Sequence, residues 1–210
     1  MAKTKAFDKH LPEYEQWFVD NHFVFQSELE AIRSVVPADG NGVEIGVGSG
    51  IFASPIGIKE GVEPSQAMRE KARERSINVI EGVAEKLPHP DESYDYAMML
   101  TTLCFVDDVL QSFKEAYRIL KKNGAFIIGF VDKNSLLGKI YLEYKDQNVF
   151  YKDAVFYGTK EVAGFLNAAG FIIEVTKQTV FGMLETIQEV QIPQNGYGNG
   201  SFVVIKAIKL

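Results

Sequence analysis

The sequence predicts an α/β protein with one mostly parallel sheet, helices on both faces and two antiparallel strands at one edge. Short apolar runs, typical of buried strands, alternate with amphipathic helical segments. One such run, residues 43–47, opens into a turn in which every second residue is glycine. The last two apolar runs are separated by the turn-forming residues 195–200. Together these three observations favour the α/β class over an all-helical or all-strand fold.

The length and composition fit one globular domain. The chain has 210 residues, of which 46% are hydrophobic and 24% charged, and it can bury one sizeable core. We expect a single domain over residues 1–210, with an N-terminal helical lid (1–40) and an insertion or lid (132–158) after the fifth strand. The sequence contains neither an apolar run of eighteen residues nor a recognisable secretory signal. We therefore expect a cytoplasmic protein without a membrane span.

Charge and cysteine content argue against several classes of function. The formal net charge is −6 and the basic residues are scattered, so a nucleic-acid partner is not expected. Cys104 is the single cysteine, which rules out an intramolecular disulfide and a zinc site built on thiolates. His10, His22 and His89 lack metal-ligand spacing, so we expect no metal. The sequence identifies no catalytic base and no oligomeric state.

In the first half of the chain, apolar residues at helical spacing predict two helices before residue 40. Residues 43–47 form the first strand, which we expect to be central because it is almost wholly apolar. Pro55 and Gly57 interrupt the segment that follows, so at most one or two helical turns are expected there. The remaining elements are strands at 58–63 and 78–81 and, between them, a polar helix that Ser65 caps and that runs through Arg75.

The second half contains the helix that the sequence marks most clearly. Asp108 and Gln111 have capping-box spacing, and Lys121 to Gly124 is typical of a helix end. The expected apolar face consists of Leu110, Phe113, Tyr117 and Leu120. This helix separates strands expected at 94–100 and 125–131, and residues 132–158 then show no clear period. The last elements are a helix from Thr159 to Gly170 and strands at 171–180 and 201–208, which we expect to form a long antiparallel hairpin.

The predicted topology gathers distant residues into one crevice. Ligands of open parallel sheets bind beyond the carboxyl ends of the strands. The carboxyl ends of the first four predicted strands are marked by the turn 46–50, Glu63, residues 82–85 and Thr101. We therefore expect them to surround one ligand site.

Two ligand classes compete for this crevice, a dinucleotide and an adenosine-bearing ligand without phosphate. The dinucleotide fingerprint Gly-x-Gly-x-x-Gly would place Ile51 where a small residue is required. Glu44, two residues before Gly46, would repel a pyrophosphate but suits a ligand that carries an ammonium group. Glu63 ends the second predicted strand, where a carboxylate can accept hydrogen bonds from both hydroxyl groups of a ribose diol. A glycine turn of this kind also occurs without a ligand, so the argument depends on the two acids.

These residues resemble the class I S-adenosylmethionine-dependent methyltransferases, and the UbiE-like small-molecule branch in particular. The resemblance spans residues 40–180 and consists of five motifs in order. They are Glu44-x-Gly46-x-Gly48-x-Gly50, Gly61-Val62-Glu63-Pro64-Ser65, residues 82–88, residues 91–95 and residues 120–124. The resemblance implies a Rossmann-like seven-stranded sheet of order 3-2-1-4-5-7-6, with strand 7 antiparallel.

The resemblance also implies S-adenosyl-L-methionine as cofactor, S-adenosyl-L-homocysteine as product, and methyl transfer by in-line displacement to nitrogen, oxygen or carbon of a small-molecule acceptor. The methionine end would lie over the glycine turn, the ribose on Glu63 and the adenine beside Val83. Position 83 is Asp in many relatives, so backbone atoms near Ala84 would have to bind the adenine amino group here. The residues expected to contact the cofactor are Glu44, Gly46, Val47, Gly48, Gly50, Glu63, Pro64, Val83, Ala84, Thr101 and Thr102.

Two aromatic groups offer an acceptor pocket. Tyr14, Trp17 and Phe18 either cover the cofactor or pack their helix on the core, and the sequence leaves both interpretations open. A second group follows the fifth strand and includes Tyr141, Tyr144, Phe150, Tyr151, Phe156 and Tyr157. The residues expected to contact the acceptor are Tyr14, Trp17, Phe18, Tyr141 and Tyr144. The alternatives to a methyltransferase are a nicotinamide-dependent oxidoreductase and a non-catalytic cofactor-binding subunit of the same fold.

Overall fold

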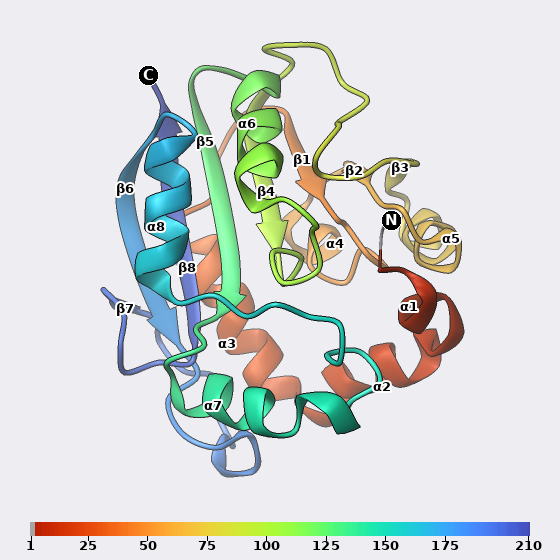
Figure 1. Cartoon of the computed structure of the whole chain (residues 1–210), viewed down its shortest axis with the longest axis vertical. Helices are drawn as coiled ribbons and strands as arrows, with labels where there is room; N and C mark the ends of the chain where they lie inside the picture. Colours follow the sequence, from red (N-terminus) through yellow and green to blue (C-terminus); the bar gives the residue numbers. More distant parts are fainter. Residues whose placement is uncertain (1–2) are drawn as a thin grey trace.

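The computed structural model describes residues 3–210, which form one sheet flanked by helices (Figure 1). The sheet contains eight strands in the order β3-β2-β1-β4-β5-β8-β6-β7. The strands are β1 (Gly42–Ile45), β2 (Glu60–Val62), β3 (Asn78–Ile80), β4 (Tyr94–Leu100), β5 (Leu120–Val131), β6 (Phe171–Thr179), β7 (Gln194–Asn195) and β8 (Phe202–Lys209). The helices are α1 (Lys5–Lys9), α2 (Leu11–Asp20), α3 (His22–Arg33), α4 (Ala53–Ile56), α5 (Gln66–Glu74), α6 (Val109–Ile119), α7 (Leu136–Glu143) and α8 (Thr159–Ala168), with short 3-10 turns η1 (Lys145–Gln147) and η2 (Leu184–Thr186).

Strand pairing confirms the predicted Rossmann-like class. β1 pairs in parallel with β2 and β4, and the parallel pairing continues to β3 on one side and β5 on the other. β8 lies between β5 and β6 and runs antiparallel to both. Apart from β7, this is the predicted order 3-2-1-4-5-7-6, because β8 is the seventh long strand in the chain. β1 is central and buried along its whole length, as its apolar sequence predicts.

Helices cover both faces of the sheet (Figure 1), and each face has its own apolar core. On one face, α3 buries Phe25, Leu29 and Ile32 against residues of β4, β5 and β8. On the other face, α6 contributes Phe113 and α8 contributes Leu166. Burying a large apolar side chain stabilises a fold by roughly 1.5–3 kcal/mol, so these two layers fix the sheet that carries the site.

Two details of the second half differ from the sequence prediction. Residues 132–158 contain α7, which Ser135 caps by accepting a hydrogen bond from Gly138 N at 3.1 Å. β6 and β8 pair antiparallel as expected. The turn at 195–200, however, joins β8 to the two-residue strand β7, so residues 180–201 form a longer connection than the expected hairpin turn. β7 has two residues, and α7 has eight residues, some of them apolar and exposed. Segments this short do not show the hydrophobic periodicity from which a strand or helix is predicted.

The apolar face of α6 is also displaced from the expected one. Val109, Phe113, Ala116 and Ile119 are buried, whereas Leu110 and Tyr117 are only partly covered. Leu120 belongs to β5, where it pairs with Tyr94. The helix start is as predicted, since the Asp108 carboxylate accepts from Gln111 N at 2.9 Å.

The N-terminal helices α1 and α2, together with α7, lie beyond the carboxyl ends of the central strands (Figure 1). Side chains tie α1 and α2 to the sheet layer. Asp8 accepts from Ser65 Oγ at 2.6 Å, and Glu15 forms an ion pair with Arg75, which also donates to Ser49 O at 2.8 Å. These contacts hold the helices across the end of the sheet where the crevice is expected.

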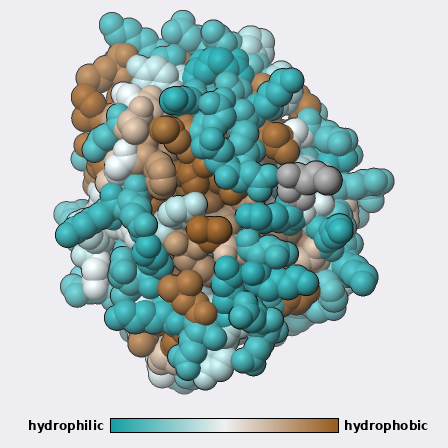
Figure 2. All heavy atoms as spheres, viewed as in Figure 1, coloured by the Kyte–Doolittle hydropathy of each residue, from teal (hydrophilic) through white to brown (hydrophobic). Residues whose placement is uncertain are grey.

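Hydrophilic side chains predominate on the face seen in Figure 2, and apolar residues show between them. No helix within residues 3–210 combines the length and apolar character needed to cross a membrane. Over the same residues, His, Cys, Asp and Glu side chains form no group of three that could hold a metal ion.

Candidate functional site

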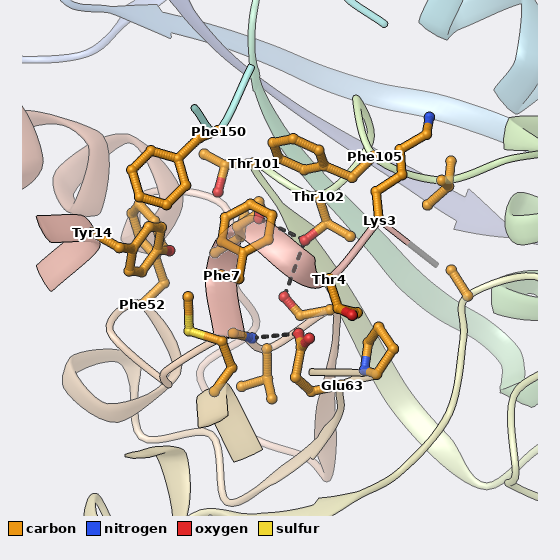
Figure 3. A pocket seen from close by; sticks show the side chains of 18 of the residues that line it. Lys3, Thr4, Phe7, Tyr14, Phe52, Glu63, Thr101, Thr102, Phe105 and Phe150 are labelled. Atoms are coloured by element: carbon orange, nitrogen blue, oxygen red, sulfur yellow. Dashed lines mark hydrogen bonds between the residues drawn. The ribbon is translucent and has the colours of Figure 1, made fainter. Parts of the chain in front are cut away.

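A cavity of about 550 Å³ lies at the carboxyl ends of β1, β2 and β4. Its volume falls in the ~300–1,000 Å³ range of small-molecule sites. Strand ends form its floor and α1, α2 and residues 141–151 form its cover. Figure 3 shows Glu63 on one side of this space and a group of aromatic rings on the other. The site therefore has a polar half on the sheet and an aromatic half under the helices.

The glycine turn after β1 brings main chain to the cavity wall. Gly46 and Gly48 have φ angles of +71° and +55°, in a backbone region that residues other than glycine rarely adopt. A Cβ at Gly46 would overlap Thr102, whose hydroxyl donates to Gly46 O at 3.0 Å. A Cβ at Gly48 would meet only the Tyr14 hydroxyl, 3.7 Å away. Gly46 is thus required for packing, whereas Gly48 leaves open space for a ligand.

Glu44 points from the buried strand β1 into the cavity. Its side chain is 1% exposed, and its Oε2 atom has no hydrogen-bond partner among residues 3–210. Burial, and then the charge of Glu63, raise the pKa of Glu44 well above its usual value. An unpartnered buried carboxylate is costly, and a cationic group in the cavity would relieve that cost.

Glu63 follows β2, and the backbone holds both of its oxygens. Oε2 accepts from Gly48 N at 3.0 Å and Oε1 accepts from Ser65 N at 2.8 Å. Burial raises the pKa of Glu63 to about 7, against the lowering effect of these two N–H groups. Each oxygen keeps a second lone pair for a ligand hydroxyl, so the geometry suits a diol.

The loop after β3 and the end of β4 complete the polar half. Val83 and Ala84 line the cavity, and Val83 forms a bridge with Lys86 that closes the loop. Thr101 follows β4 with a φ of +51°, which is strained for a β-branched residue. Its N–H donates to Gly129 O at 2.8 Å. Both segments therefore form part of the cavity wall on the side of the sheet.

The aromatic half is assembled from three separate parts of the chain. The ring of Phe7 on α1 lies 5.9 Å from Tyr14, 5.0 Å from Phe105 and 5.5 Å from Phe150, measured between centroids (Figure 3). Trp17, Phe18, Tyr141 and Tyr151 also line the cavity. Phe18 belongs at the same time to the apolar core. One face of α2 therefore packs on the core and covers the cavity, and the covering of a cofactor by these residues stays a prediction.

Glu28 is a second unpartnered acid in this cavity. It lies on the buried face of α3 and is 5% exposed, and its carboxyl group forms no hydrogen bond or ion pair with residues 3–210. Burial raises its pKa to about 8. Burial also raises the pKa values of Tyr141 and Tyr151, and the Glu28 charge adds to both shifts. Glu28 therefore lies among the tyrosines of the aromatic half.

Most residues predicted to form the site meet in this cavity. Two do not. Gly50 lies outside it, and its missing side chain makes room for Ile77. Tyr144 follows α7 and is 52% exposed, away from the cavity. The predicted residues that line it are Tyr14, Trp17, Phe18, Glu44, Gly46, Val47, Gly48, Glu63, Pro64, Val83, Ala84, Thr101, Thr102 and Tyr141.

The sequence prediction missed Phe7, Phe52, Phe105 and Glu28 as cavity residues. A signal for Glu28 exists. It lies three residues after Phe25 and four before Ile32, so it shares the apolar face of a helix, where a carboxylate is unusual.

Known proteins resemble this chain in sequence and in structure. A family model described as a methyltransferase domain matches residues 43–128. A crystal structure from Thermotoga maritima is described as a SAM-dependent methyltransferase and possible histamine N-methyltransferase. It has 47% sequence identity and a TM-score of 0.96, covering 99% of this chain and 100% of its own.

The chain belongs to the S-adenosylmethionine-dependent methyltransferase family. An uncharacterized protein from Methanocaldococcus jannaschii is 42% identical over 205 residues. The matched region covers 98% of this chain and 99% of the relative. The likeness therefore extends over the N-terminal helices and residues 132–158 as well as the sheet. The ubiquinone/menaquinone biosynthesis C-methyltransferase UbiE of Rickettsia bellii is 30% identical over 157 residues, 65% of this chain and 63% of the relative. The predicted class I resemblance is confirmed, with UbiE as a more distant relative.

Proposed function

We propose that this protein binds S-adenosyl-L-methionine in the cavity and transfers its methyl group to a small-molecule acceptor. The proposal rests on one observation above all. Two buried carboxylates at neighbouring strand ends, Glu44 and Glu63, open into the same cavity beside the bare backbone of Gly48. One acid suits an ammonium group and the other a ribose diol, and S-adenosylmethionine carries both.

The residues present fit this cofactor. Glu44, whose Oε2 atom has no partner within residues 3–210, would receive the α-ammonium group. Glu63 would hold the ribose hydroxyls with the lone pairs that its backbone donors leave free. Val83 and Ala84 would flank the adenine with apolar surface. When bound, the cofactor supplies an electrophilic methyl group on a positively charged sulfur.

The protein's own contribution is alignment and exclusion of water. The sulfur leaving group needs no proton, so positioning is the main requirement and can supply on the order of 7–11 kcal/mol in favourable cases. The cover formed by Phe7, Tyr14, Phe105 and Phe150 closes the space over Glu63 (Figure 3). Aromatic faces also attract cations, which suits a sulfonium in this half of the cavity.

Nitrogen, oxygen and carbon acceptors are all compatible with the fold. The description of the Thermotoga relative as a possible histamine N-methyltransferase favours nitrogen, whereas UbiE is a C-methyltransferase. A nicotinamide cofactor is disfavoured because Glu44 would face its pyrophosphate. We expect no binding of NADH in a fluorescence titration.

Isothermal titration with S-adenosylhomocysteine tests the proposal. Wild-type protein should bind, and Glu63→Ala should weaken binding about 100-fold, because hydrogen bonds to a charged acceptor are each worth about 1.5–3 kcal/mol. Glu70→Gln is the matched control, since Glu70 is exposed on α5 and accepts a hydrogen bond from Gln66 at 3.0 Å. Absence of heat with folded wild-type protein would refute the proposal. A broad acceptor panel then separates an enzyme from a non-catalytic cofactor-binding subunit.

A further inference from the structure

We propose that the methyl acceptor is a small cationic amine and that Glu28 is the carboxylate that receives its ammonium group. This inference rests on the proposed function, because it assigns the part of the cavity that the cofactor would leave open. It adds a binding residue outside the five sequence motifs of the family.

The first argument is the charge of the cavity. Six acidic side chains line it and one basic side chain does, counted over residues 3–210. The basic one, Lys3, forms an ion pair with Asp107. The acidic residues are Glu13, Glu28, Glu44, Glu63, Glu85 and Asp107. Burial raises the pKa values of Glu28 and Glu44 in the empty cavity, and an entering cation can displace a proton from a carboxyl group and pair with the carboxylate. This lining therefore favours cations over neutral or anionic acceptors.

The second argument is the place of Glu28 within the cavity. Glu28 lines the cavity from helix α3, together with Tyr14 and Tyr141. The two acids assigned to the cofactor come from the sheet instead, Glu44 from β1 and Glu63 from the residue after β2. An acceptor held there would have its nitrogen among the aromatic rings, which bind cations through their faces.

The third argument is that the Glu28 carboxyl group has no partner among residues 3–210. The residue is 95% buried, since 5% of it is exposed, and no hydrogen bond or ion pair of its side chain to these residues is formed. The titratable groups around it are the hydroxyls of Tyr14 on α2, Tyr141 on α7 and Tyr151 after η1. A carboxylic acid so placed is a costly feature, and an ammonium ligand would satisfy it with a charge-assisted hydrogen bond.

Glu28 can also take the proton that must leave before transfer. A bound ammonium gives one proton to a Glu28 carboxylate oxygen, and the free lone pair of the nitrogen forms the N–CH3 bond while the C–S bond breaks. The bonding pair remains on sulfur, giving S-adenosylhomocysteine and a methylated ammonium. Glu28 then releases its proton to solvent, so one proton leaves in each turnover.

Titration of amines into protein saturated with S-adenosylhomocysteine tests the inference. The probes are 2-phenylethylamine and its neutral counterpart 2-phenylethanol. We expect the amine to bind and the alcohol to bind at least 10-fold more weakly. Glu28→Gln should weaken amine binding about 10- to 100-fold, while Glu28→Asp, which keeps the charge, should retain the preference for the amine. Glu30→Gln, which removes an exposed carboxylate from the same helix, should have no effect.

Proton release gives a readout that a merely structural role would not change. Free Glu28 holds a proton at pH 7 because burial raises its pKa, and binding of an ammonium displaces it. Titration in two buffers of different ionisation enthalpy should show release of close to one proton from wild type and none from Glu28→Gln. Equal binding of amine and alcohol, or unchanged amine binding in Glu28→Gln, would overturn the inference. So would the absence of amine binding to protein that binds S-adenosylhomocysteine, an outcome that leaves the proposed cofactor site intact.

Discussion

Replacing Glu28 with glutamine should change how the stability of the unliganded protein depends on pH. The pKa of Glu28 is about 8 in the folded state, against about 4.3 for an unperturbed glutamate. The folded state therefore holds a proton that the unfolded state has released, and stability falls as pH rises between these two values. Each pH unit in this window costs about 1.4 kcal/mol, so the carboxylate destabilises the fold by about 3–4 kcal/mol more at pH 8 than at pH 5.

Glutamine has nearly the same shape and cannot ionise, so Glu28→Gln should lack this loss. For a chain of 210 residues, about 1 kcal/mol corresponds to roughly 2–4 °C in Tm. We expect differential scanning calorimetry without ligand to show that the Tm difference between variant and wild type is roughly 10 °C larger at pH 8 than at pH 5, in favour of the variant. Glu30→Gln, exposed on the same helix, serves as the control with no pH-dependent gain. A difference between Glu28→Gln and wild type that is the same at both pH values would refute the assignment of Glu28 as a buried acid without a partner.

Three further changes test other parts of the site. Glu44→Gln should weaken S-adenosylhomocysteine about 10- to 100-fold in isothermal titration, because a charged acceptor for the ammonium is lost; unchanged affinity would exclude Glu44 from the site. Gly46→Ala should destabilise the fold by at least about 2 kcal/mol in urea unfolding, because the new methyl overlaps Thr102 and the φ is positive; an unchanged midpoint would argue against this backbone. Arg75→Ala removes the ion pair to Glu15 that holds α2, worth up to about 1 kcal/mol, and should speed S-adenosylhomocysteine dissociation several-fold in stopped-flow tryptophan fluorescence; an unchanged rate would show that α2 does not gate release.

The sheet and its polar half could be predicted because their sequence signals are local and strong. A strand that is apolar on both faces must be central, which placed β1, and the glycine turn then fixed where a ligand could approach the main chain. Glu44 and Glu63 could be assigned to the site because each lies at or near the carboxyl end of a predicted parallel strand, where ligands bind. Gly50 satisfied the same pattern, but its positive φ serves packing against Ile77, a long-range contact that spacing does not reveal.

The aromatic half could be predicted only in part, because it depends on how α1, α2 and α7 fold back over the sheet. Tyr141 and Tyr144 are both aromatic residues of one short segment, yet one lines the cavity and the other is exposed. An eight-residue helix gives too few turns to assign its buried face from sequence. Glu28 was missed for another reason, since charged residues on amphipathic helices are normally taken to face solvent.

The crystal structure of the protein with S-adenosylhomocysteine bound tests the central claim most directly. We expect the ribose hydroxyls within hydrogen-bond distance of Glu63, the α-ammonium beside Glu44, the adenine between Val83 and Ala84, and open space between the sulfur and Glu28. A ligand seated with its ammonium on Glu28, or bound outside this cavity, would contradict the account.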